Sequence, residues 1–542
     1  MGIEIHLSIS DSVTQQEWET VYEETLQLVQ AFPLAEVRSV TIKGIHVRCL
    51  VPTREQKEIG RWNRGKIDLG WSAVGDYETM MTAEDYYLPR NLVNLQEAAP
   101  DAKDALLGII CDDMDEEWDD SPYKKFYTLW RNKTQGKPYH LYLLAIACLI
   151  QARLGKKAFV YGGITRGQCR KAVEMANEHL SMPIDIPDRC DMERFFRRVS
   201  DLPLSKKQQL TVFTRFYLGT QDAKFGTFLR KAYAEEVCDE YWSAVFKEYQ
   251  IGTIGFEDSI SNYLLWGFDL EKLCHFVNCK DAAFVKRVMD AKLHIKDKDC
   301  SDVLQIDQEE SRPYSVATLF AQLAFAGAKN RKVDRYIPIE EIRKSLRKGL
   351  AGQCDTDAVI DEYLAAEAEK PPIRIPKKGM SQEEIRDAYS QDAADVFSQI
   401  MELKRQELDE ERKKYVIDAY EDLIYYKKGD TMYPDISHSL CGLLVFFERM
   451  LQEDAYWKLM SCSAKARCEW LVEQNEHFQF RDKDWERIFT DIEEHDEAYA
   501  RYYPMMRADI KSEDHRFMVT AVALNDELYK YGRELAQTHQ AR

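Results

Sequence analysis

The sequence lacks the features of membrane-spanning and of secreted proteins. Its longest strongly apolar stretch, residues 141–150, has about ten residues, whereas a helix needs roughly 20 to cross a bilayer. Residues 1–10 alternate apolar and polar side chains and have neither the basic nor the apolar region of a signal peptide. The 13 cysteines follow no repeating spacing, which favours free thiols over a disulfide framework. We therefore expect a cytoplasmic protein with no membrane partner.

Glycine and proline are also scarce. Among 542 residues there are 24 glycines and 16 prolines, while 45% of the residues are hydrophobic. This composition excludes collagen-like and disordered chains. At about 150 residues per domain, the length predicts three or four domains.

Positive charge is in deficit. Lys and Arg total 74 against 93 Asp and Glu, which gives a net charge of -19. A field of this sign repels phosphate backbones, so nucleic acid is an unfavourable partner. Another protein, or a small anionic ligand held by local contacts, is the partner that we expect.

The patterning predicts an α+β protein. Small α/β units fill the first 200 residues, a mostly helical array follows, and a helical bundle ends the chain. We predict an α/β domain over residues 1–100, an α/β segment over 101–200, a helical array over 201–368 and a C-terminal bundle over 381–542. Residues 369–380 contain three prolines and a glycine, which predicts a linker open to trypsin.

Local signals support the first of these units. Thr14 and Glu17 have capping-box spacing before a stretch with helical periodicity. Apolar residues with a period of two then surround Gly44, which predicts strands on both sides of it. Thr82 and Asp85 indicate the N-terminal cap of a further helix.

A glycine-rich turn is the strongest candidate for a ligand site. Residues 157–161 are expected to form a strand, 162–167 a turn and 168–180 a helix. Free amides at a helix N-terminus favour anions, and the residues that would bind one are Gly162, Gly163, Thr165, Arg166 and Arg170. The turn matches neither the dinucleotide-binding nor the P-loop pattern, so a purely structural turn is the alternative.

Cys169 lies at the start of the same helix. The helix dipole and neighbouring cations would lower the pKa of its thiol, as in reactive cysteines. Nucleophilic catalysis also needs a base, and His179 is about 15 Å along the helix, too far away. His140 or a histidine distant in the sequence is therefore the candidate base, and a buried structural thiol is the alternative role for Cys169.

Four residues have side chains suitable for zinc: Cys274, Cys279, His294 and Cys300. Their spacing is loose, and Cys274 falls inside a predicted helix, so we predict no stoichiometric zinc and no cofactor. Elemental analysis of the purified protein tests this directly. The acidic residues 112–120 lack the glycine and terminal glutamate of a calcium-binding loop.

These observations favour a multidomain protein that acts by binding another protein or a small ligand. The alternative is an enzyme of unfamiliar type, a hydrolase or transferase, with an anion-binding site at residues 161–169. Whether it is an enzyme stays open, because no hydrolase, zinc-protease or kinase motif occurs.

Overall fold

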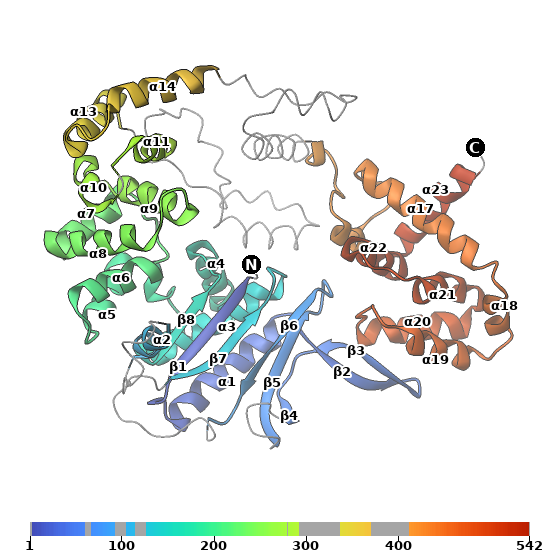
Figure 1. The fold of residues 1–542 in the computed structure, drawn as a ribbon. Coiled ribbons are helices and arrows are strands. Elements are labelled where there is room, and N and C mark those ends of the chain that lie inside the picture. Colours follow the sequence, from blue (N-terminus) through green and yellow to red (C-terminus); the bar gives the residue numbers. More distant parts are fainter. Residues whose placement is uncertain are drawn as a thin grey trace. The chain divides into compact units, whose positions relative to one another are not determined.

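The α+β prediction is confirmed. A computed structural model describes residues 3–59, 67–92, 104–113, 126–278, 280–291, 337–369 and 411–540. The described strands all lie within residues 4–162, with helices between them, and beyond residue 162 the described elements are helical (Figure 1). The described residues form two compact units, one from residues 3–186 and 411–540 and the other from residues 187–291 and 337–369.

Two sheets form the N-terminal part of the first unit. One has the strand order β7-β1-β8 and the other β3-β2-β5-β4, with β6 paired to β5. All pairs are antiparallel. The strands are β1 (Glu4–Ser10), β2 (Leu34–Ile42), β3 (Ile45–Pro52), β4 (Gln56–Ile59), β5 (Ile67–Asp76), β6 (Thr82–Pro89), β7 (Phe126–Lys133) and β8 (Ala158–Gly162).

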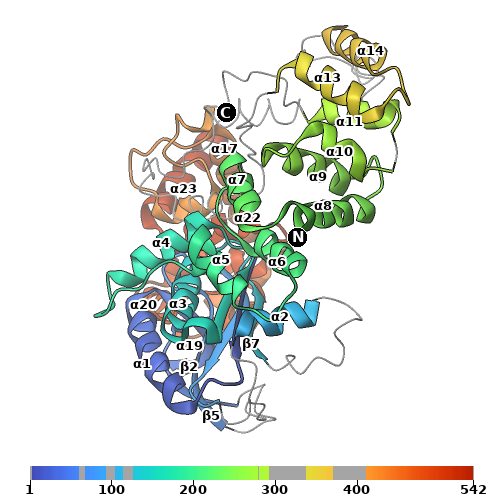
Figure 2. The same ribbon diagram turned by 90° about the vertical axis from the view of Figure 1, so that its left-hand side faces the viewer.

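Helices cover mainly one face of these sheets. The N-terminal helices are α1 (Gln15–Ala31), α2 (Ala105–Asp113), α3 (Tyr139–Leu154) and α4 (Arg166–Asn177), with a 3-10 turn η1 (Gly155–Lys157). Indole hydrogen bonds fix α1 to the second sheet, since Trp71 donates to Thr25 and Trp18 to the Pro89 carbonyl. Figure 1 shows α1 and α3 behind the strands, and Figure 2 shows α2 on the other side.

The β2–β3 hairpin turns at Lys43 and Gly44. Their φ angles of 48° and 78° are both positive, as in the two-residue turn that matches the strand twist. Glycine meets this demand without strain. The predicted strands on either side of Gly44 are thus confirmed.

One face of this hairpin packs against helices that lie more than 400 residues further along the chain. Val47 and Cys49 are buried in one core with Phe480 and Trp485. Helices α19 (Ala464–Gln474) and α20 (Asp482–Glu494) contact the hairpin. The other elements of the C-terminal bundle are α17 (Pro434–Met450), α18 (Asp454–Met460), α21 (Tyr499–Arg507), α22 (Glu513–Leu524) and α23 (Asp526–Gln540), with 3-10 turns η3 (Tyr420–Tyr425) and η4 (Asp496–Ala498). The hairpin therefore joins the sheets to the C-terminal bundle.

The second unit is helical in its described part, as predicted for the middle of the chain. None of the described helices in either unit is long and apolar enough to span a membrane. The elements of the second unit are η2 (Asp188–Cys190), α5 (Met192–Ser200), α6 (Lys206–Phe216), α7 (Ala223–Ala232), α8 (Glu235–Glu248), α9 (Ile254–Leu265), α10 (Leu270–Phe276), α11 (Ala282–Asp290), α13 (Ile339–Leu350) and α14 (Thr356–Glu369).

One local prediction is wrong. Thr82 and Asp85 lie in strand β6, where pairing with β5 prevails over the capping pattern. Most of the predicted linker, residues 370–380, and most of the acidic stretch, residues 114–120, lie outside the described residues. The predicted domain boundaries stay predictions.

Candidate functional site

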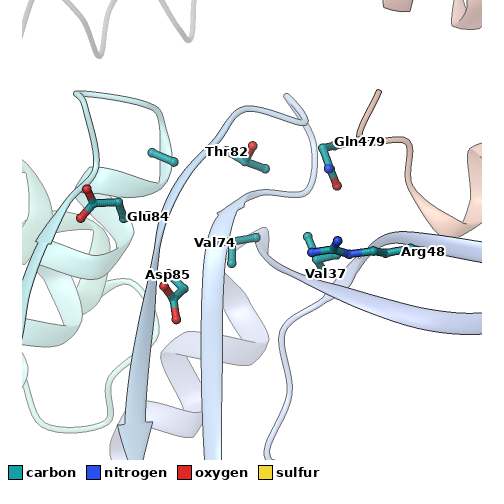
Figure 3. Close-up of a pocket in the computed structure, with 8 residues that line it drawn as sticks. Val37, Arg48, Val74, Thr82, Glu84, Asp85 and Gln479 are labelled. Carbon is teal, nitrogen blue, oxygen red and sulfur yellow. The ribbon is translucent and has the colours of Figure 1, made fainter. Parts of the chain in front are cut away.

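A groove opens where two hairpins diverge. Strand β2 pairs with β5 only at its start, through Leu34 with Asp76 and Ala35 with Gly75. Beyond this point the β2–β3 and β5–β6 hairpins separate (Figure 3). The groove has a volume of about 370 Å³ and is lined by Val37, Arg48, Val74, Thr82, Ala83, Glu84, Asp85 and Gln479. This volume is within the range of small-ligand sites.

An irregularity in β6 shapes one wall of the groove. The register shifts between Ala73 and Gly75 of β5, because Tyr86 pairs with Ala73 and Thr82 with Gly75. Residues 83–85 of β6 are opposite Val74 alone, so β6 has two extra residues that bulge from the ladder. Such bulges commonly re-aim side chains at binding sites. Gly75 permits the close approach, because a Cβ there would overlap the carbonyl oxygen of Met81.

The walls carry opposite charges. Arg48, on β3, is exposed and reaches toward Val37, while Asp85, also exposed, lies beyond Val74 (Figure 3). The neighbouring Glu84 turns away from the groove, since its Oε2 accepts a 2.8 Å hydrogen bond from the Lys133 amide. Asp85 is therefore the carboxylate that a ligand in the groove would meet.

Two hydrogen bonds show which backbone groups of β2 face away from β3. The Thr53 amide donates to the Leu34 carbonyl at 2.8 Å, so Leu34 faces β3. The Leu50 amide donates to the Phe480 carbonyl, so the backbone groups of Leu50 face away from β2. Two residues directly opposite each other in an antiparallel pair either exchange backbone hydrogen bonds or both direct their backbone groups away from the partner strand. Val37 is opposite Leu50 and therefore faces outward.

This alternation leaves an open strand edge beside the groove. Ala35, Val37, Ser39 and Thr41 all direct their backbone groups away from β3. Ala35 is paired with Gly75, but no other segment of the described chain pairs with the next three. Ser39 and Thr41 are exposed. The edge of β2 over residues 37–41 is thus open to a partner strand.

The glycine-rich turn predicted as a ligand site uses much of its hydrogen-bonding capacity internally. The Gly163 amide donates to the Glu4 carbonyl at 2.9 Å. Thr165 caps helix α4 in a capping box, exchanging hydrogen bonds with Gln168. The Cys169 amide donates to the Thr165 carbonyl. The turn therefore fixes the start of α4 against strand β1.

The remaining residues of that turn point to solvent or approach β1. A Cβ on Gly162 would lie 2.8 Å from the Glu4 carbonyl, and the φ of 101° also favours glycine. Arg166 and Arg170 are exposed, and Arg170 lies 4.0 Å from Glu174. The structure brings these residues together at one helix end, with both guanidinium groups on the surface.

The two candidate catalytic residues are both buried. Cys169 is 0% exposed and His140 is 2% exposed, on helices α4 and α3, which pack together. The Nδ1 atom of His140 lies 2.7 Å from the Thr134 hydroxyl. Burial lowers the pKa of His140 to about 4, so its ring is neutral at pH 7. A base role would require substrate to reach the interior.

Thiol labelling can test this burial. We expect iodoacetamide to modify Cys462 quickly in the native protein, because its side chain is exposed, and to leave Cys169 protected until denaturant is added. Mass spectrometry of the peptides measures both. Rapid modification of native Cys169 would contradict its burial and favour the catalytic hypothesis.

One of the four possible zinc ligands lies in the described residues. Cys274 is buried in α10, where burial raises the pKa of its thiol to about 12. Cys279, His294 and Cys300 lie outside the described part of the chain. Within the described part, no three His, Cys, Asp or Glu residues form a metal-binding group. The absence of zinc stays a prediction.

Comparison with known proteins gives no lead beyond these residues. No family model, curated protein or solved structure matches the chain.

The groove residues were not among the sequence-based candidates. The alternation of Ile45, Val47 and Cys49 already places Arg48 on the opposite face of its strand, which is a usable signal. No sequence signal brings Gln479 to the same place, because its approach depends on the pairing of Leu50 with the segment beside Arg481.

Proposed function

We propose that this protein is a binding module for a ligand of the amino-acid or peptide type, held in the groove between the two hairpins. The observation that carries the proposal is a cation, Arg48, and a carboxylate, Asp85, placed across an apolar floor of Val37 and Val74. A ligand with a carboxylate and an ammonium group is complementary to both walls.

The groove is polar enough to orient such a ligand. Thr82 supplies a hydroxyl and Gln479 an amide, which can hydrogen-bond backbone groups of a peptide. Arg48 can bind a carboxylate through two parallel hydrogen bonds. These contacts act at a few ångströms, whereas the field of the net charge of -19 is screened within about 8 Å at physiological salt.

The alternative, an enzyme with an anion site at residues 161–169, has less support. Gly163, Thr165 and Cys169 use their amides within the fold, and the Cys169 side chain is buried. Exposed Arg166 and Arg170 keep an anion site there testable, by their replacement with alanine.

Peptide affinity tests the proposal. An array of short peptides that vary in charge, probed with the full chain, should favour those with both an acidic and a basic residue. For a selected peptide, Arg48→Ala and Asp85→Asn should each weaken binding about tenfold, about 1.4 kcal/mol, because each removes one charge contact. Isothermal titration calorimetry measures the change.

Arg54→Ala is the matched control, because Arg54 is an exposed arginine of the same unit that does not line the groove. The Arg54→Ala variant should bind the selected peptide with the same affinity as the wild type. Equal loss in Arg54→Ala and Arg48→Ala would indicate a general charge effect and would contradict binding in the groove.

A further inference from the structure

The open edge of β2 begins inside the groove. Val37 both lines the groove and directs its backbone groups away from β3. From Val37 the edge continues through Ser39 and Thr41, which are exposed. Any ligand in the groove that has a peptide backbone therefore meets, at one side, amides and carbonyls with which no described segment pairs.

We infer that the occupant is an extended polypeptide segment that pairs with β2 over residues 37–41 and so adds a strand to the sheet. This inference rests on the proposed function. Strand addition to a free edge gains affinity from main-chain hydrogen bonds and specificity from alternate side chains. It also satisfies the edge groups that β5 stops covering after Ala35.

The charges on the walls specify the partner's side chains. Arg48 is directly opposite Ser39 in the register, on the same face of the hairpin as the groove. A partner residue beside Ser39 that points to this face should therefore be acidic. Asp85 lies toward the inner end of the groove, so a basic residue two positions away, on the same face, should meet it. The partner segment is expected to contain an acidic and a basic residue separated by one residue.

A proline scan of the edge tests strand addition. Proline at position 39 removes an amide that faces outward and leaves the hydrogen bonds between β2 and β3 intact. We expect Ser39→Pro to weaken binding of an acidic-x-basic peptide at least about tenfold, about 1.4 kcal/mol. Ser39→Val keeps the amide and should bind as the wild type does. Unchanged thermal unfolding of both variants shows that the hairpin is intact.

Peptide chemistry gives a second test that leaves the protein unaltered. N-methylation of successive peptide residues should weaken binding at alternate positions only, because every second amide faces β2. A peptide with the charges three positions apart should bind more weakly, since its charges lie on opposite faces.

The outcomes separate the inference from the proposed function. If Arg48→Ala weakens binding but Ser39→Pro and every N-methylated peptide bind normally, the groove binds its ligand and strand addition is wrong. If Arg48→Ala and Asp85→Asn both bind normally, the proposed function itself is wrong.

Discussion

Replacing Trp485 by alanine is expected to lower the free energy of unfolding by about 4 kcal/mol. Trp485 is 0% exposed and lies in the core shared by the β2–β3 hairpin and the C-terminal helices. Its ring packs against Phe480 and Phe489. Removal loses this buried area and leaves a cavity that the surrounding side chains fill only in part. Urea unfolding of the full chain, followed by circular dichroism, measures the loss.

Trp457 provides the matched control. It lies in the same bundle but is 59% exposed, so Trp457→Ala should change stability by less than about 0.5 kcal/mol. The shared core also predicts which region loses stability. The backbone amides of Val47 and Cys49 should exchange hydrogen faster in Trp485→Ala than in the wild type. A loss of stability confined to the C-terminal helices would contradict a common core.

Acidification should destabilise the protein through His140 by as much as about 3 kcal/mol. Burial lowers the pKa of this histidine from 6.5 to about 4. The neutral ring is favoured in the folded state, so its contribution is complete above pH 6.5 and is lost as the pH falls toward 4. Below that range the folded protein must hold a buried charge or unfold.

A difference measurement isolates this contribution. Burial also raises the pKa of Asp76 from its ordinary value of 3.8 to about 6. Asp76 therefore adds stability as the pH falls from 6 to 3.8, and this effect opposes that of His140. We therefore compare wild type with His140→Gln, which cannot titrate. The stability difference between the two proteins should shrink as the pH falls from 6.5 to 4.

Direct titration by NMR gives an independent check: a pKa of His140 near 6.5 would show that the ring is not buried as described.

Local patterns predicted much of the N-terminal fold. The alternation of residues 3–9 corresponds to β1, and the capping box at Thr14 opens α1. The expected strand, glycine turn and helix correspond to β8 and α4, with Thr165 in a second capping box. These features depend on neighbours in the sequence, so single-sequence patterns suffice for them.

Long-range packing could not be predicted in the same way. Nothing in the sequence around Cys49 indicates that this residue shares a core with Trp485, because that contact depends on how distant segments fold back. The same holds for the groove, whose residues come from four strands and a segment near residue 479. At Thr82 the local capping pattern predicted a helix, but this residue pairs with Gly75 of β5 and lies in a strand.

The glycine-rich turn before α4 illustrates why a sequence pattern can indicate a site that the fold does not leave free. An anion site at this turn needs free amides, but the Gly163 amide donates to the Glu4 carbonyl and the Thr165 amide donates to Oε1 of Gln168. Sequence shows which residues can donate, but not which partners already accept. The strand pattern places Arg48 on the face opposite Val47 and Cys49, but only the fold brings Asp85 to the other wall of the same groove.

Hydrogen exchange resolved at single amides of β2 tests the central claim most directly. In the free protein, the amides of Val37, Ser39 and Thr41 should exchange faster than those of Arg38 and Val40, which face β3. Adding an acidic-x-basic peptide should slow the first three and leave the other two unchanged. Equal exchange at both sets in the free protein, or no slowing at Val37, Ser39 and Thr41 under conditions where the peptide is bound, would contradict the account.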